Sequence, residues 1–149
     1  MIDLEANPVR AARLPDWQER LEAVIIQAQA EPFAWGQNDC CLFVGRAAEA
    51  ITGRDYTSKF VGQYGDLASG LKRLWRAARV KSLADYADKL FLRTPVALAH
   101  RGDWALACLT TQPTGEIAPV MLLVDGPWLI TSTGDRLPRG LAEICWRVA

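Results

Sequence analysis

The chain has 149 residues, of which 50% are hydrophobic and 23% are charged, and these proportions are typical of one globular domain rather than of a disordered segment. Lysine plus arginine and aspartate plus glutamate both number 17, so no net charge favours nucleic acid or an acidic membrane surface as a partner. No stretch reaches the ~18 apolar residues of a membrane span, and we expect no signal peptide because the first residues lack a long apolar run.

The cysteines and the single histidine exclude the common metal patterns. The sequence contains four cysteines and one histidine, His100, and no C-x-x-C spacing occurs. A chain with this much apolar material has no need of a disulfide framework. We therefore expect free thiols, no metal and no cofactor. The cysteines are Cys40, Cys41, Cys108 and Cys145.

The N-terminal region divides into an arm and the first helix of the domain. Residues 1–14 show no steady period and predict an irregular arm, so the domain is expected to span residues 15–149. Asp16 with Glu19 matches a capping box, and the apolar period that follows predicts a helix to about Ala30.

A second helix is predicted directly after the stretch from Pro32 to Asp39. Its apolar residues recur at helical spacing from Cys40, and Gly53 predicts its end after about Thr52. Asn38 or Asp39 is the expected N-cap. Cys40 therefore falls in the first helical turn, where free backbone N–H groups favour a thiolate over a thiol.

Two further helices follow. Asp66 caps the first, and Ser82 with Asp85 begins the second. One side of the helix that starts at Asp66 carries Leu67, Leu71, Leu74, Trp75 and Ala78. The other sides carry a basic cluster, which we interpret as a solvated face, made of Lys72, Arg73, Arg76 and Arg79.

From His100 onward the period changes to that of strands. We predict strands at 103–109, 117–124, 128–131, near 136–137 and at 144–148. Asp125-Gly126 is a hairpin signal between the second and third of them. Helices followed by an antiparallel meander predict an α+β domain. Three tryptophans are expected to fill the core between sheet and helices or to form an interface: Trp104, Trp128 and Trp146.

The motif Trp-Gly-x-x-Asp-Cys, which opens a helix ahead of a strand meander, resembles that of the NlpC-type cell-wall peptidases, which are small papain-like cysteine hydrolases. The whole pattern is similar to an uncharacterised family encoded in phage and prophage tail-gene clusters, with Pro-Phe-x-Trp-Gly-x-x-Asp-Cys-Cys near the start and Trp-Arg-Val at the end. In this chain these motifs are Pro32 to Cys41 and Trp146 to Val148. The resemblance implies a papain-like fold of N-terminal helices packed on a C-terminal meander.

The resemblance places the nucleophile at Cys40 and the histidine base near Ala118-Pro119-Val120. Pro119 marks the position of the missing histidine, because proline has no titratable side chain. The third, orienting residue of such sites maps near Thr131 and Ser132. A papain-like nucleophile needs a base that takes its proton and returns it to the leaving amine, so catalysis by Cys40 is expected to be silent.

Other residues near the motif have two interpretations each. Trp35 either stacks on a substrate or packs between its loop and the sheet, and Asn38 belongs to the same candidate binding surface. We interpret Asp39 as a helix cap rather than as a catalytic acid. His100 precedes the first of the meander strands and is expected at the far end of the hairpin from Cys40.

Three hypotheses for the function follow. The first is a non-enzymatic structural or assembly component of a phage or prophage tail tip, located in the virion, with other tail or baseplate proteins as partners. The second is an active cysteine hydrolase of cell-wall peptides in which His100 or another chain supplies the base. The third is a module that binds a cell-wall peptide or glycan in the former substrate groove.

Overall fold

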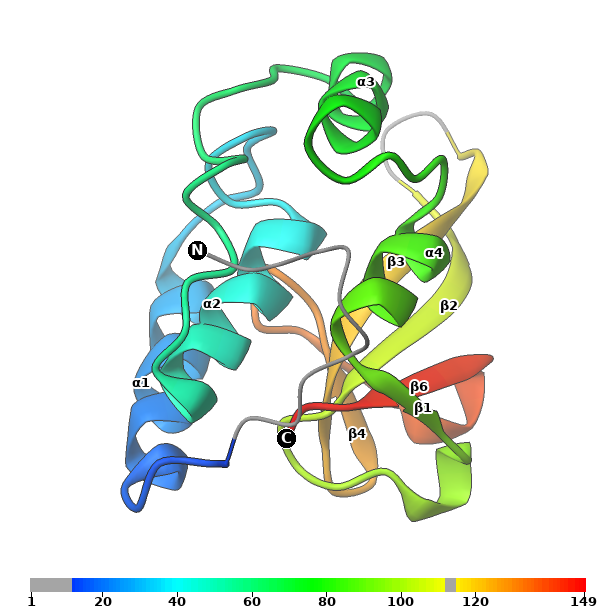
Figure 1. The fold of residues 1–149 in the computed structure, drawn as a ribbon. Coiled ribbons are helices and arrows are strands. Elements are labelled where there is room, and N and C mark those ends of the chain that lie inside the picture. Colours follow the sequence, from blue (N-terminus) through cyan, green and yellow to red (C-terminus); the bar gives the residue numbers. More distant parts are fainter. Residues whose placement is uncertain (1–11, 112–114) are drawn as a thin grey trace.

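In the computed structural model, which describes residues 12–111 and 115–149, the helices precede most of the strands (Figure 1). The α-helices are α1 (Trp17–Ala30), α2 (Cys40–Thr52), α3 (Leu67–Ala78) and α4 (Leu83–Leu90). The strands are β1 (Leu92–Thr94), β2 (Trp104–Thr110), β3 (Ile117–Asp125), β4 (Trp128–Ile130), β5 (Arg136–Pro138) and β6 (Ile144–Arg147). The 3-10 helices are η1 (Val96–Leu98) and η2 (Arg139–Leu141). Among the described residues, no helix combines the length and the apolar character that a membrane span requires.

The strands pair antiparallel in one sheet with the order β1-β6-β2-β3-β4-β5. Strands β2 to β5 form the predicted meander. Strand β6 instead crosses back to lie between β1 and β2, and the sequence did not predict β1, whose three residues are too few to show a period. The α+β class is confirmed, and the papain-like assignment, which is a finer statement, stays a prediction.

The helices cover one face of the sheet and enclose the larger core. Residues from α1 to α4 pack there against inward-facing side chains of β2, β3, β4 and β6. Trp104 and Trp146 are buried in this layer, and the indole N–H of Trp104 donates to the carbonyl of Val44 in α2 at 2.9 Å. Trp128 is 40% exposed, so it does not fill the core as the other two do.

The opposite face of the sheet buries a smaller apolar cluster without any α-helical residue. Leu122, Val124 and Leu129 lie in it, and the segments around η1 and η2 close it. Along β3, Met121 and Leu123 therefore face the helices, whereas Leu122 and Val124 face the smaller cluster. This alternation decides which residues of β3 can meet α2.

Most helix boundaries follow the predicted caps, with one correction. The carboxylates of Asp39 and Asp66 and the hydroxyl of Ser82 each accept a backbone N–H in the first turn of α2, α3 and α4. The capping box predicted at Asp16 and Glu19 is wrong. Asp16 has φ −102° and ψ 24°, which is a turn conformation rather than the extended one of an N-cap, and its side chain accepts no capping bond.

A buried ion pair joins the two ends of the described chain. The carboxylate of Asp103 is 0% exposed and accepts from the guanidinium of Arg13 at 3.0 Å. It also accepts the backbone N–H of Val148 at 2.9 Å and that of His100 at 2.7 Å. This carboxylate thus holds the residues before α1, the entry to β2 and the end of β6 in one place.

We expect the substitution Asp103→Ala to lower the free energy of unfolding by about 3–5 kcal/mol, because it leaves a largely buried guanidinium and two backbone N–H groups without their acceptor. Urea unfolding followed by circular dichroism measures the change. The matched control is Glu22→Ala, since Glu22 forms an exposed ion pair with Arg101 and its loss should cost less than about 1 kcal/mol. Equal effects of the two substitutions would contradict this ranking.

Candidate functional site

The loop that precedes α2 is a tight turn closed by backbone pairing. Ala34 and Asn38 form an isolated antiparallel bridge, with N···O distances of 3.1 and 2.8 Å. Between them Gly36 has φ +75°, and a Cβ added there would lie 2.2 Å from the carbonyl oxygen of Tyr64. Only glycine permits both the left-handed backbone and this close approach. The backbone conformation and the packing at this position therefore require the glycine of the motif.

Asp39 organises the loop and the start of α2. Its carboxylate is 1% exposed, and Oδ1 accepts the backbone N–H of Leu42 at 3.0 Å. Oδ2 accepts the backbone N–H of Gly36 at 2.9 Å and the hydroxyl of Tyr64. The interpretation of Asp39 as a helix cap is confirmed. A carboxylate with these donors already in place is a structural acceptor rather than a proton shuttle.

Cys40 is the first residue of α2, and this partly buried residue packs against the larger core. A hydrogen bond from the Cys41 thiol lowers the pKa of Cys40, and the backbone N–H groups of Met121 and Cys41 lower it further. Burial and the charge of Asp39 act in the opposite direction, but the net shift of the Cys40 pKa is downward. The start of a helix adds to the stabilisation of a thiolate.

Cys41 carries the opposite shift. Its thiol donates to Cys40, and this bond, together with burial and the charges of Cys40 and Asp39, raises its pKa well above the ordinary value. The pKa values of the two neighbouring thiols are thus shifted in opposite directions.

The edge of β3 explains why a backbone N–H of Met121 can meet a thiol. Strand β4 pairs with β3 only from Leu123 to Asp125, so the earlier half of β3 has no strand partner on that side. The start of α2 lies against this free edge, and α2 and β3 are in contact along it.

Pro119 lies on the same half of β3, two residues before Met121. Side chains alternate along a strand, so Pro119 shares the helix-facing side with Met121, and it is exposed there. Its own N has no hydrogen to donate, which suits the unpaired edge. The position that the resemblance assigns to the base thus lies on the helix-facing side of β3, and its side chain carries neither a proton acceptor nor a donor.

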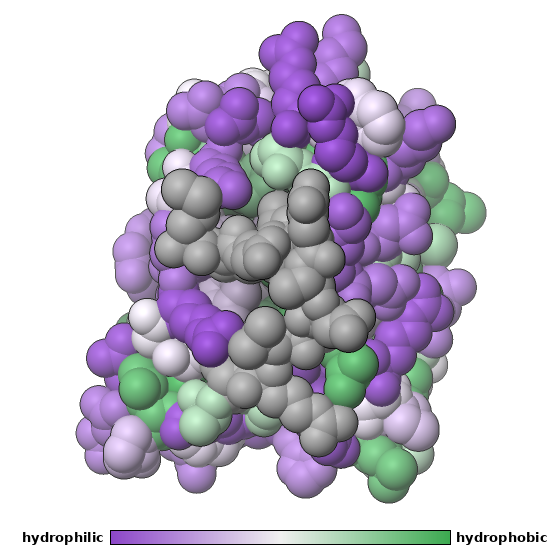
Figure 2. Space-filling view, viewed as in Figure 1, coloured by the Kyte–Doolittle hydropathy of each residue, from purple (hydrophilic) through white to green (hydrophobic). Residues whose placement is uncertain are grey.

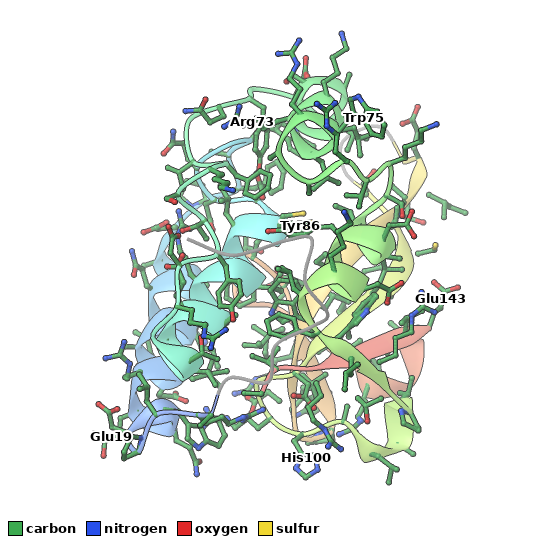
Figure 3. All side chains as sticks on the ribbon, in the orientation of Figure 1. Glu19, Arg73, Trp75, Tyr86, His100 and Glu143 are labelled. Atoms are coloured by element: carbon green, nitrogen blue, oxygen red, sulfur yellow. The ribbon has the colours of Figure 1, made fainter. Side chains whose placement is uncertain are left out.

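His100 lies at the other end of β2 and β3, toward the bottom of Figure 3. Its backbone carbonyl accepts from Asp103, and Asp103 pairs with Val124, three residues along β3 from Met121. Three residues of strand span about 10 Å. The exposed imidazole lines a different hollow of about 530 Å³, beside Trp17 and Arg147, and does not reach Cys40.

The remaining predicted site residues are only partly brought together. The side-chain amide of Asn38 donates to the carbonyl of Ser132 at 3.2 Å, and both residues are buried. The hydroxyl of Thr131 accepts the backbone N–H of Asp135 at 3.1 Å and therefore stabilises the turn after β4. These contacts join the loop before α2 to the end of β4, but they add no base.

Trp35 does not pack between its loop and the sheet, and that interpretation is wrong. Its side chain is 39% exposed and meets the 48% exposed ring of Phe33 edge to face, with ring centroids 5.0 Å apart. The bridge between Ala34 and Asn38 turns this part of the loop outward. The pair is an exposed aromatic surface on the loop that leads to Cys40.

Sequence reasoning missed Tyr64 and the backbone of Met121. Tyr64 comes from a segment without a helical or strand period, and only the folded chain places its hydroxyl on Asp39. Burial and then the hydrogen bond to Asp39 raise the pKa of Tyr64, so this phenol is not a base for Cys40. A backbone N–H leaves no residue-specific signal in a sequence at all.

Among the described residues, no group of three or more histidine, cysteine, aspartate or glutamate side chains is placed to hold a metal ion. The family model described as Domain of unknown function (DUF6950) matches residues 12–148, which is nearly the whole chain, and the chain belongs to that family. No curated protein and no solved structure gives a significant match.

We expect iodoacetamide to alkylate Cys40 at lower pH than Cys108. Cys108 is exposed to the reagent, but a hydrogen bond to Glu143 raises its pKa. It is therefore the control for a thiol that is accessible but is less ionised. Because a lowered pKa means more thiolate at a given pH, the rate at Cys40 should rise at a lower pH than the rate at Cys108. Mass spectrometry of the labelled peptides measures both rates. A faster reaction at Cys108 near neutral pH would mean that exposure, not ionisation, governs the reactivity.

The substitution Asp39→Asn should move the pH midpoint of Cys40 alkylation further down. The charge of Asp39 raises the pKa of Cys40, and asparagine removes that charge while it keeps an oxygen for the N–H of Leu42. The control is Glu22→Gln, which removes a carboxylate that lies exposed in α1. An upward shift in Asp39→Asn, with a native circular dichroism spectrum, would contradict the assignment.

Proposed function

We propose that this member of the DUF6950 family is a non-enzymatic structural or assembly component of a phage or prophage tail tip. It is built on a degenerate NlpC-like scaffold that lacks the catalytic histidine. Its partners are other tail or baseplate proteins, and its place is in the virion. The observation that supports this proposal is a thiol at the start of a helix, with Pro119 at the strand position to which the resemblance assigns the base.

The chemistry of amide hydrolysis explains why the absent base matters. The thiolate attacks the carbonyl, but the leaving amine must receive a proton before the carbon–nitrogen bond breaks. A positioned acid–base group contributes about 10²–10⁴-fold to such a rate. Cys40 has donors from Met121 and Cys41 that stabilise its charge, and neither is a proton shuttle for a leaving amine.

The same contacts have a structural use. The backbone N–H of Met121 in β3 acts on the Cys40 thiol at the start of α2, and the carboxylate of Asp39 ties the loop to Tyr64. Phe33 and Trp35 then stand exposed on that loop as apolar contacts for a partner chain. In this proposal Cys40 is retained because of its packing contacts and not because of its chemistry.

One observation favours the alternative, an active cysteine hydrolase of cell-wall peptides. The lowered pKa of Cys40 is the property that a nucleophile needs. His100 lies at the far end of the sheet, so the base would have to come from another chain.

The test is incubation of the purified chain with peptidoglycan stem peptides, followed by mass spectrometry of the products. We expect no cleavage by the wild-type chain or by Cys40→Ala, and circular dichroism checks that the variant is folded. Cleavage by the wild type that Cys40→Ala abolishes would overturn the proposal and establish the hydrolase.

A second arm addresses the location. Particles purified from a host that carries the gene should contain the chain in fixed proportion to the other tail proteins, as measured by quantitative mass spectrometry. A chain that is produced in the host but absent from intact particles would contradict the virion assignment.

A further inference from the structure

Helix α3 carries an apolar row that the described residues cover only in part. Its members recur every four residues, and their side chains are 49%, 39% and 44% exposed. They are Leu67, Leu71 and Trp75. The sequence placed them on one apolar side with Leu74 and Ala78, but only the latter two are buried. The apolar side of α3 is therefore wider than the surface on which the helix packs.

A basic row runs beside the apolar row. Lys72 and Arg76 directly follow Leu71 and Trp75, so each lies about 100° further round the helix. Arg79 and Lys81 extend this row past the end of α3 and lie 5.5 and 5.9 Å from the ring of Trp75. None of these cations forms an ion pair with a carboxylate of the described residues.

The orientation of α3 leaves both rows toward solvent. Arg73 lies on the opposite side of the helix from Trp75 (Figure 3) and donates to the backbone carbonyl of Lys59 at 2.8 Å. The ring of Tyr64 packs against α3 at Gly70, where an added Cβ would lie 3.2 Å from the ring. Figure 2 shows hydrophilic residues gathered over the end of the molecule that carries α3.

We propose that the two rows of α3 form a docking surface for an amphipathic, acidic helix of a partner protein. Rows spaced by four residues are the ridges by which helices interlock. A partner helix with leucine-like side chains in one such row and glutamate or aspartate in the next matches both the apolar and the basic row. The inference rests on the proposed role in assembly, for which it names the surface and the class of partner.

Charge selects this occupant over others. A second copy of α3 would bring like charges together, which disfavours self-association through the same face. A membrane requires a broad apolar face that enters the lipid, whereas this row is one side chain wide and each side chain is already half covered. An acidic helix satisfies the cations and covers the row at the same time.

The probe is a synthetic fluorescent peptide that forms a helix with leucine and glutamate rows four residues apart. A second peptide keeps the leucines and replaces each glutamate by lysine. Fluorescence anisotropy with the whole chain should show binding of the acidic peptide, weakening as salt is raised, and at least tenfold weaker binding of the basic one. Vesicles of phosphatidylserine and phosphatidylcholine are tested in parallel.

Trp75→Ala should weaken binding of the acidic peptide by about tenfold or more, as expected for a central aromatic contact. The charge reversals Lys72→Glu and Arg76→Glu together should do the same and should remove the salt dependence. Ile26→Ala is the matched control, because Ile26 is 58% exposed on α1 and should leave the affinity unchanged. Circular dichroism confirms that each variant is folded.

Equal binding of both peptides, no binding of the acidic one, or tighter binding to the vesicles than to the acidic peptide would overturn this inference. These outcomes are distinct from a failure of the proposed function. If the chain assembles into particles but does not bind the acidic peptide, only the docking role of α3 is refuted. A chain that binds the peptide but cleaves stem peptides through Cys40 refutes only the structural role.

Discussion

The geometry around Cys40 depends on one buried carboxylate. Asp39 accepts from the first turn of α2, from the glycine of the preceding turn and from the hydroxyl of Tyr64. Each of these donors comes from a different part of the chain, and each would be left unsatisfied in a buried environment without it. The loop, the start of α2 and the segment before α3 are therefore positioned together. Cys40, as the next residue, takes its direction toward β3 from this arrangement.

The free edge of β3 supplies the second half of the arrangement. Because β4 is short, the backbone of Met121 meets the Cys40 thiol instead of another strand. Two donors and the helix start then favour the thiolate, while burial and the charge of Asp39 oppose it. The outcome is a thiol with a lowered pKa, and the only histidine of the chain, His100, lies at the other end of β2 and β3. Ionisation and catalysis are separate properties, and only the first follows from these contacts.

The features of the fold that depend on neighbouring residues could be predicted from the sequence. The caps at Asp39, Asp66 and Ser82 and the strand at 117–124 were readable, because each depends on residues within a few positions. Asp16 shows the limit of such patterns, since the same residue types adopted a turn there. The return of β6 to β2, the approach of Tyr64 to Asp39 and the exposure of Trp35 depend on contacts between distant parts of the chain, which no local pattern encodes.

Two residues of the motif before α2 are explained by folding constraints. Gly36 has a left-handed backbone against the carbonyl of Tyr64, and Asp39 caps the helix and closes the loop. Both requirements hold whether or not Cys40 performs chemistry. A match to the motif therefore indicates that the loop folds in this way, and it says little about activity. The resemblance to cysteine peptidases, which stays a prediction, assigns the base to a position about eighty residues later on β3, where the chain has Pro119. The contacts of the motif are needed for folding in either case, because Asp39 holds the loop, the start of α2 and Tyr64 together.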